Sequence, residues 1–198
     1  LANDLVCSKT FDDRVGCFQL IEALRENDGT YPNDIYYVFT VQEEVGCRGS
    51  KTTAAFIKPD IGIAVDVTPA HDYPCDLTGS NAIGEGIGIK VADPSVLCDE
   101  DVVAVMEQCC RHKDIPFQYE VIDKGGCDAS SMSLSNFGVR AAVFLLSLVT
   151  LTAAAALSQR KMRKLAFVFV LHFQNMNFNF DVWGNKRYDA YHFLAICQ

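Results

Sequence analysis

Residues 35–67, IYYVFTVQEEVGCRGSKTTAAFIKPDIGIAVDV, place two β-branched and aromatic runs on either side of a short helical pattern. Ile35 to Val41 and Ile61 to Val67 each have the length of a strand. Strands that are apolar almost throughout are covered on both faces, as in parallel or mixed sheets. Between them SKTTAAFI, starting at Ser50, predicts a short helix. Strand, helix and strand in succession indicate an α/β fold with a central sheet.

The same alternation extends in both directions. Upstream, apolar residues recur at helical spacing from Asp12 to Asn27, and Asp12 or Asp13 can cap the first turn. Downstream, the patterns of strand, helix and strand are GIGIKVAD from Gly86, DEDVVAVMEQCCRHKD from Asp99 and FQYEVID from Phe117. We therefore expect a three-layer α/β fold, a sheet of mostly parallel strands with helices on both faces.

Composition limits the class of partner and the compartment. The chain has 198 residues, 49% of them hydrophobic, and a net charge of −8. A chain of this length can form one domain with a single core. The negative charge argues against nucleic-acid binding, which depends on lysine and arginine. Nine cysteines without a CxxC pair, and no basic N-terminal signal, favour reduced thiols and a cytoplasmic location.

The charge changes sign along the chain. Residues 1–140 hold 11 Lys and Arg against 23 Asp and Glu, whereas residues 141–198 hold 6 against 2. We predict a catalytic-domain core at 1–140 and a divergent apolar and basic tail at 141–198. The uncharged run 141–157 is interpreted as a buried strand followed by an alanine-rich helix. At 17 residues it is short for the alternative, a membrane helix. The remaining tail has no clear period and is expected to be irregular.

Acidic residues stand at the ends of three predicted elements. Asp12 and Asp13 begin a helix, Glu43 and Glu44 follow one strand, and Asp66 lies near the end of another. Parallel strands direct their carboxyl ends to one edge of a sheet, so these groups are expected to meet. Clustered carboxylates repel one another, and a bound metal best explains such a cluster. Adjacent glutamates diverge, so one can bind metal while the other acts as a general base.

Six ordered motifs resemble metallopeptidase family forty-two, the TET-type glutamyl/leucyl aminopeptidases that are often labelled endoglucanase- or cellulase-like. The resemblance covers about Thr10 to Arg140 and implies a zinc-peptidase-like fold. The motifs are FDDRVG (11–16), VFTVQEEVGCRG (38–49), PDIGIAVDVT (59–68), GEGIGIKVAD (84–93), IPFQYEVI (115–122) and GGCDA (125–129).

The resemblance assigns a role to each acid. It implies that Asp12 bridges two metal ions and that Asp13 follows it across an unusual peptide bond. It further implies that Glu43 is the general base, Glu44 a ligand of one metal and Asp66 a ligand of the other.

The resemblance also implies the cofactors and partners. Two divalent ions, zinc or cobalt, are expected, with short peptides as substrates and a homo-oligomer as the assembly; no nucleic-acid or membrane partner is expected. Asp128 is expected to support the site. Cys127 stands where the family has threonine, which removes a hydroxyl group beside Asp128.

Two histidine ligands of the family have no counterpart at the expected positions. The first is expected upstream of this chain, and the second belongs to an RYxHS motif expected soon after Val139, where the sequence continues RAAVFLLSL. His172, His71 and His112 are poor replacements, and the latter two are expected to face solvent. We therefore expect low metal occupancy. A shifted reading frame or a truncated gene copy is our hypothesis for the change after Arg140, and sequencing the gene would test it.

These residues bear on three possible functions. The leading prediction is a metal-dependent aminopeptidase in a truncated or impaired copy. The alternative is a non-catalytic peptidase-fold protein that associates with a membrane or with partners through its apolar tail. A glycosidase needs two carboxyl groups that face each other across the sugar bond, and the neighbours Glu43 and Glu44 do not suit that geometry.

Overall fold

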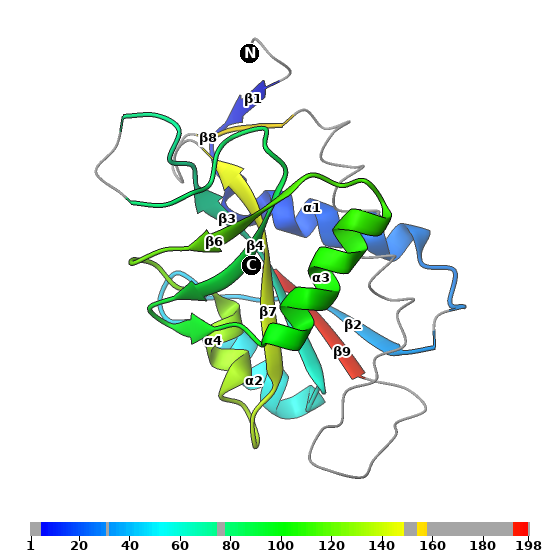
Figure 1. The fold of residues 1–198 in the computed structure, drawn as a ribbon. Coiled ribbons are helices and arrows are strands. Elements are labelled where there is room, and N and C mark those ends of the chain that lie inside the picture. The colour runs from blue at the N-terminus through cyan, green and yellow to red at the C-terminus, as the bar shows by residue number, and fades with distance from the viewer. Residues whose placement is uncertain (1–4, 31, 75–77, 149–153, 158–191, 198) are drawn as a thin grey trace.

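The computed structural model describes residues 5–30, 32–74, 78–148, 154–157 and 192–197. Strands and helices alternate along most of this part of the chain (Figure 1). The elements are β1 Leu5–Ser8, α1 Phe11–Glu26, β2 Asp34–Phe39, α2 Arg48–Ile57, β3 Ile61–Pro69, β4 Ile87–Asp93, β5 Val96–Leu97, α3 Glu100–His112, β6 Phe117–Val121, α4 Asp128–Ser133, β7 Arg140–Leu148, β8 Ala154–Leu157 and β9 His192–Cys197.

The main sheet has the strand order β2-β9-β3-β7-β4-β5, and β6 also pairs with β4. The strands β2, β9, β3 and β7 are parallel to one another, and β4 and β6 form a second parallel pair. The two groups meet where β4 runs antiparallel to β7. This arrangement confirms the mostly parallel sheet predicted from the sequence.

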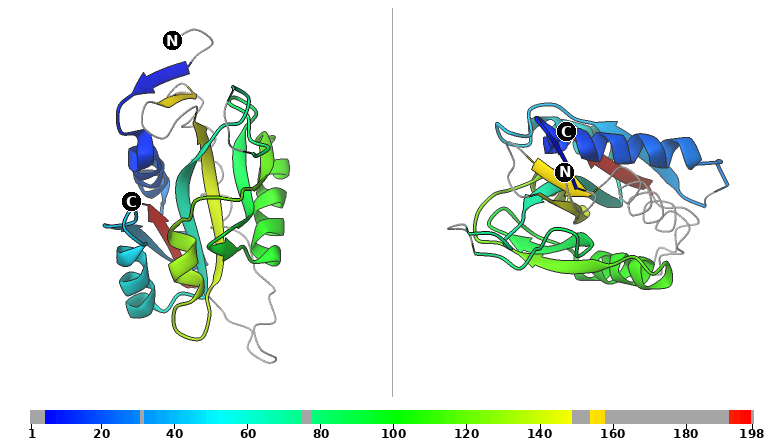
Figure 2. Two further views of the ribbon diagram at one scale, coloured as in Figure 1. Left: turned by 90° about the vertical axis from the view of Figure 1, so that its left-hand side faces the viewer. Right: turned by 90° about the horizontal axis from the view of Figure 1, so that it is seen from above.

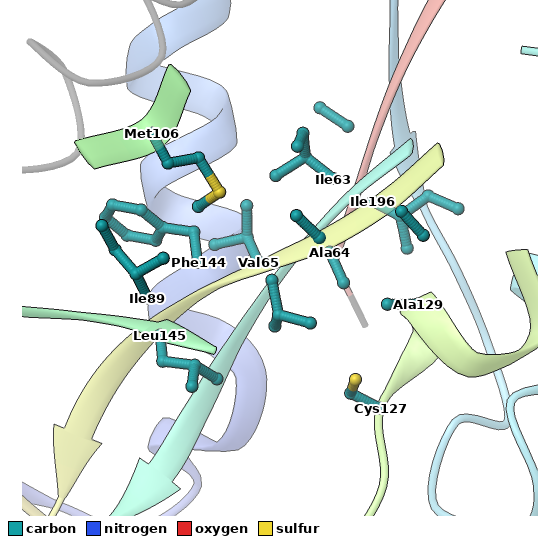
Figure 3. Close-up of a cluster of buried hydrophobic side chains, with 14 of the residues drawn as sticks. Ile63, Ala64, Val65, Ile89, Met106, Cys127, Ala129, Phe144, Leu145 and Ile196 are labelled. Carbon is teal, nitrogen blue, oxygen red and sulfur yellow. The ribbon is translucent and has the colours of Figure 1, made fainter. Parts of the chain in front are cut away.

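Helices cover both faces of the sheet, as expected for three layers. The helices α1 and α3 lie on one face, and α2 and α4 lie on the other (Figures 1 and 2). The apolar side chains between these layers fill both sides of β3 and β7 (Figure 3). Met106, Val65, Ile89 and Phe144 gather on one side, and Ala129 and Cys127 lie on the other.

The uncharged run after Arg140 is a strand at first, as predicted. Strand β7 pairs with β3 from Ile61↔Arg140 to Pro69↔Leu148, and residues 141–146 are buried. The alanine-rich helix expected next is wrong for Ala154–Leu157, which is strand β8. Although alanine favours helices, these residues pair with β1 in a separate two-stranded sheet, and such tertiary pairing overrides local propensity.

The tail also supplies a strand that the sequence did not indicate. Strand β9 lies between β2 and β3, and Leu194 and Ile196 are fully buried there. The division at residue 140 stays a prediction, as does the character of residues 158–191, which lie outside the described part. Among the helices of that described part, not one is both long enough and apolar enough to cross a membrane.

Candidate active site

Asp12 and Asp13 lie where the chain enters α1. The peptide bond between them is cis, which agrees with the unusual bond implied by the resemblance, and both residues have non-helical dihedral angles. The regular helix begins after them, with Asp13 Oδ1 accepting a hydrogen bond of 2.9 Å from the Gly16 amide. Asp13 therefore caps the helix, as predicted. Gly16 has no room for a side chain, since a Cβ atom there would lie 2.2 Å from Asp13 Oδ2.

Glu43 and Glu44 occupy a tight turn between β2 and α2. The amides of Gly46 and Cys47 donate hydrogen bonds of 2.8 and 2.9 Å to the Glu43 carbonyl oxygen, which fixes the turn. The Cys47 thiol donates to Glu43 Oε1 at 3.5 Å. The turn leaves Glu44 exposed and Glu43 half-buried, so the adjacent carboxyl groups have different environments.

Asp66 lies in β3, three residues before its end, and its Oδ1 atom accepts a hydrogen bond of 2.7 Å from the Val67 amide. Because β2 and β3 both run parallel to β9, their carboxyl ends lie at the same edge of the sheet. The turn that carries Glu43 follows β2 at that edge. The topology thus brings the acids of two strands together.

The pKa values show how strongly these groups affect one another. Burial, followed by the charge of Glu44, raises the pKa of Asp12 to about 6. Burial, followed by the charge of Asp128, raises the pKa of Glu43 to about 7, with smaller contributions from Glu44 and Asp12. Burial also raises the pKa of Asp66 well above its ordinary value, and Glu43, Asp12 and Asp128 raise it further.

Asp13 belongs to the same cluster. Burial and the charge of Asp66 raise its pKa well above the ordinary value, and its Oδ2 atom is buried without a hydrogen-bond partner. Through these contributions to the pKa values, each of the six acids that the sequence singles out influences at least one other or is influenced by one. They form a region of concentrated negative charge at the rim of the sheet, which we call the acidic rim: Asp12, Asp13, Glu43, Glu44, Asp66 and Asp128.

Asp128, at the start of α4, is the most firmly held of these acids. It is buried and accepts hydrogen bonds of 2.8 Å from Thr40 Oγ1 and 2.6 Å from Ser50 Oγ. These two hydroxyl groups satisfy Asp128 although Cys127 replaces the family threonine beside it. The sequence does not predict either donor, because each is an ordinary polar residue near the end of a strand or the start of a helix.

A buried ion pair near the acidic rim was also missed. Lys90 Nζ lies 2.5 Å from Glu120 Oε2 and 3.2 Å from Asp93 Oδ2, and all three side chains are almost fully buried. Glu120 also accepts hydrogen bonds from Thr68 Oγ1 and Asn81 Nδ2. Burial by itself would lower the pKa of Lys90, but the two carboxylates outweigh it and raise the pKa. The lysine is therefore held in its charged form.

A pocket of about 200 Å³ connects this buried ion pair with the acidic rim. Asp66, His71, Lys90 and Cys127 all line it. The expectation that His71 faces solvent is wrong, because its Nε2 atom is buried and the residue lines the pocket. His112, at the end of α3, is exposed as predicted, and His172 lies outside the described residues.

The negative charge of these acids is suited to binding a cation, although the side chains do not form a complete metal-binding site. Hard divalent ions bind carboxylate oxygens, and a cation would relieve the repulsion that raises these pKa values. Within the described ranges, however, no three His, Cys, Asp or Glu side chains lie close enough together to hold a metal ion. The donors present therefore fit a divalent cation by chemistry, and the assignment of individual ligands stays a prediction.

A mostly parallel α/β sheet with acids gathered at the carboxyl ends of its strands is the architecture of an α/β enzyme domain. The model of the M42 glutamyl aminopeptidase family matches residues 1–152. The chain belongs to this family, a family of metallopeptidases for which divalent metal cofactors are implied.

Individual relatives agree with the family assignment. A putative aminopeptidase of Acetivibrio thermocellus is 45% identical over 139 residues, which are 70% of this chain and 42% of that protein. A TET aminopeptidase from a marine sediment Thaumarchaeota archaeon superimposes with a TM-score of 0.78 at 26% identity, over 87% of this chain and 50% of that one. The TET1 peptidase of Pyrococcus horikoshii, which can assemble into a tetrahedron or a large octahedral shell, gives 0.74 at 25% identity, over 90% and 52%. The chain thus spans about half the length of these proteins or less.

Proposed function

We propose that this chain carries the acidic part of an aminopeptidase active site that removes N-terminal residues from short peptides. The observation that supports it is the set of acids at the rim, which raise one another's pKa values. In this proposal Asp12, Glu44 and Asp66 hold two divalent ions, zinc or cobalt, and Glu43 is the general base. When bound, such ions lower the pKa of a water ligand and so make hydroxide accessible near neutral pH.

Glu43 is suited to act as a general base, because its half-buried carboxyl group lies in the turn that follows β2 at the rim and a positioned carboxylate can take a proton from water. Its carboxyl group would accept a proton from the attacking water and deliver it to the departing amine. Asp128 contributes by raising the pKa of Glu43, and its own position is fixed by Thr40 and Ser50.

The acidic rim also accounts for recognition of a free N-terminus. The α-amino group of a peptide is cationic at neutral pH or slightly below it. A concentrated negative charge attracts such a group and raises its local concentration. Asp13 lies in this field, with one oxygen atom buried and without a hydrogen-bond partner.

We further propose that activity is low. The motif that supplies a histidine ligand in the family is missing after Val139, and the residues at this place form strand β7. Buried apolar side chains at 141–146 cannot replace an imidazole donor. Metal affinity and turnover are therefore expected to be reduced.

Metal titration of the purified chain tests the site. Cobalt is a better probe than zinc because its absorption spectrum depends on its ligands. Cobalt bound to cysteine has a thiolate charge-transfer band, and cobalt bound to carboxylates does not. We expect carboxylate-type binding that Asp66→Asn abolishes and that Glu26→Gln, at the exposed end of α1, leaves unchanged. Binding that is unaffected by Asp66→Asn would show that the rim is not the metal site.

Hydrolysis of leucine- and glutamate-anilides tests the reaction. Slow release that chelator stops and Glu43→Gln removes is the expected result, with Glu26→Gln again as the control. Rapid, chelator-sensitive hydrolysis would contradict the proposed impairment. Hydrolysis that survives Glu43→Gln would contradict the role of Glu43.

A second candidate is a non-catalytic peptidase-fold protein. It is favoured by the lack of a closed set of metal donors within the described part of the chain. Large apolar side chains are exposed, among them Phe56 in α2 and Phe137 in the loop after α4. We propose self-association into a homo-oligomer, as for the TET1 peptidase. Light scattering tests the self-association, and a monodisperse monomer would contradict it.

For location we propose the reducing cytoplasm, on the ground of nine cysteines without a CxxC pair. Cell fractionation tests this. Recovery of the protein with the membrane fraction would favour attachment through the apolar tail instead.

A further inference from the structure

Two cysteines that are 180 positions apart in the sequence meet between α1 and β9. The Cys197 thiol donates to the Cys17 sulfur atom, with 3.2 Å between the two sulfur atoms. A disulfide bond is about 2.05 Å long, so the sulfur atoms need to approach by only about 1.2 Å. The two sulfur atoms are not bonded to each other in the structure.

The two thiols differ in accessibility. Cys17 is half-buried on the face of α1, whereas Cys197 is 1% exposed at the end of β9. Burial, followed by the neighbouring Cys17 thiol, raises the pKa of Cys197 far above its ordinary value. Because Cys17 is the more accessible of the two, a small oxidant can reach it first, and the Cys197 sulfur atom, 3.2 Å away, lies within reach of the oxidised sulfur.

We propose that Cys17 and Cys197 form an oxidative modification site, in which hydrogen peroxide converts the two thiols into an intramolecular disulfide. The Cys17 thiolate attacks one peroxide oxygen, the O–O bond breaks, and Cys17 becomes a sulfenic acid while hydroxide leaves and takes up a proton as water. The Cys197 sulfur then attacks the Cys17 sulfur. The S–S bond forms, the S–O bond breaks, and the departing hydroxide takes the Cys197 proton as a second water. Two thiols lose two electrons, and one peroxide gains them.

The crosslink would join α1, which carries Asp12 and Asp13 of the acidic rim, to β9. The Cys197 carbonyl oxygen accepts a hydrogen bond of 2.7 Å from the Thr40 amide, and Thr40 Oγ1 bonds Asp128. Cys17 lies about one helical turn after Asp13 and contributes to the raised pKa of that residue. A disulfide here would fix β9 to α1 four residues after Asp13. Cytosolic disulfides of this kind are usually catalytic or redox-sensing.

Peptide mapping of the full chain tests the proposal without any need for activity. After peroxide treatment and tryptic digestion without reductant, residues 15–25 and 188–198 are expected in one crosslinked peptide, lighter than the sum of the two by two hydrogen atoms. Dithiothreitol is expected to separate them again. Both thiols should be protected from iodoacetamide before reduction and reactive after it.

Variants distinguish this pair from other cysteines. Cys17→Ser is expected to abolish the crosslink, and Cys7→Ser, at an exposed cysteine of β1, is expected to leave its yield unchanged. Because Cys17 is half-buried, its serine variant should fold, and a far-ultraviolet circular dichroism spectrum checks this. Recovery of Cys17 mainly as sulfinic acid, or paired with other cysteines as often as with Cys197, would overturn the proposal. Neither outcome bears on the proposed aminopeptidase reaction, so the two can fail separately.

Discussion

Lys90 is the residue whose replacement should cost the most stability among the charged groups of the sheet. Its ammonium group neutralises Glu120 at 2.5 Å and Asp93 at 3.2 Å, and the three side chains are 3%, 0% and 0% exposed. In Lys90→Met the volume is nearly kept, but two buried carboxylates lose their counterion. Removing one partner of a buried ion pair typically costs about 3–5 kcal/mol. That is a large share of the roughly 5–15 kcal/mol by which most domains are stable.

Urea unfolding, followed by circular dichroism, measures this loss. The matched control is Arg140→Gln, which removes an ion pair to Asp99 and Asp101 whose side chains are partly exposed. Surface pairs contribute at most about 1 kcal/mol, so the control should change little. Adding Glu120→Gln to Lys90→Met should restore part of the stability, since one unpaired charge is removed. A Lys90→Met protein within about 1 kcal/mol of the original would refute the reasoning, because it would mean that water reaches these carboxylates.

Three further predictions concern stability. Phe144→Ala, at a core position that is 1% exposed, should lose about 3–5 kcal/mol in urea unfolding, whereas exposed Phe137→Ala should stay within about 0.5 kcal/mol. The raised pKa values of Asp12 and Glu43, about 6 and about 7, mean that the metal-free folded chain binds protons more tightly than the unfolded chain. This stabilisation is complete below the pKa values of the unfolded chain, 3.8 and 4.5, and is lost as the pH rises through the folded values of about 6 and about 7. In the presence of chelator, the urea midpoint should therefore fall as the pH rises to about 7. In Glu43→Gln this fall should be smaller. Ser50→Ala removes one of two hydroxyl donors to a buried carboxylate and should cost about 1–3 kcal/mol in the same assay; no change would mean that water replaces the hydroxyl group.

The sequence predicts the acidic rim because the position of these acids follows from the topology of the sheet. Glu43 follows one parallel strand and Asp66 lies near the end of another, and strands of this kind direct their carboxyl ends to one edge. No such rule places Thr40 or Ser50 beside Asp128, since a hydroxyl group near an element's end is compatible with many partners. Their contact became visible only once α2 and α4 were packed on the same face of the sheet.

The other omissions have two different causes. Lys90 and Glu120 lie within predicted strands, where a charged residue usually faces solvent, and their mutual neutralisation is a contact between strands that a single strand does not reveal. Strand β9, in contrast, is apolar enough for a central strand, but the sequence around it is also rich in apolar and aromatic residues. The limits of the strand therefore cannot be recognised from the sequence. The alanines of Ala154–Leu157 favour a helix, but this segment pairs with β1 and is a strand.

Strand β9 also decides whether the acids can meet. In the sheet order β2-β9-β3, the two strands that lead to Glu43 and Asp66 make no direct ladder with each other, and β9 joins them through parallel pairing on both sides. The Thr40 amide and hydroxyl group both approach the carbonyl oxygen of Cys197, and the same hydroxyl group reaches Asp128. Asp128 in turn raises the pKa of Glu43. A tail strand without any recognisable motif thus sets the spacing of the acidic rim and, through Thr40 and Asp128, influences the proton affinity of its proposed base.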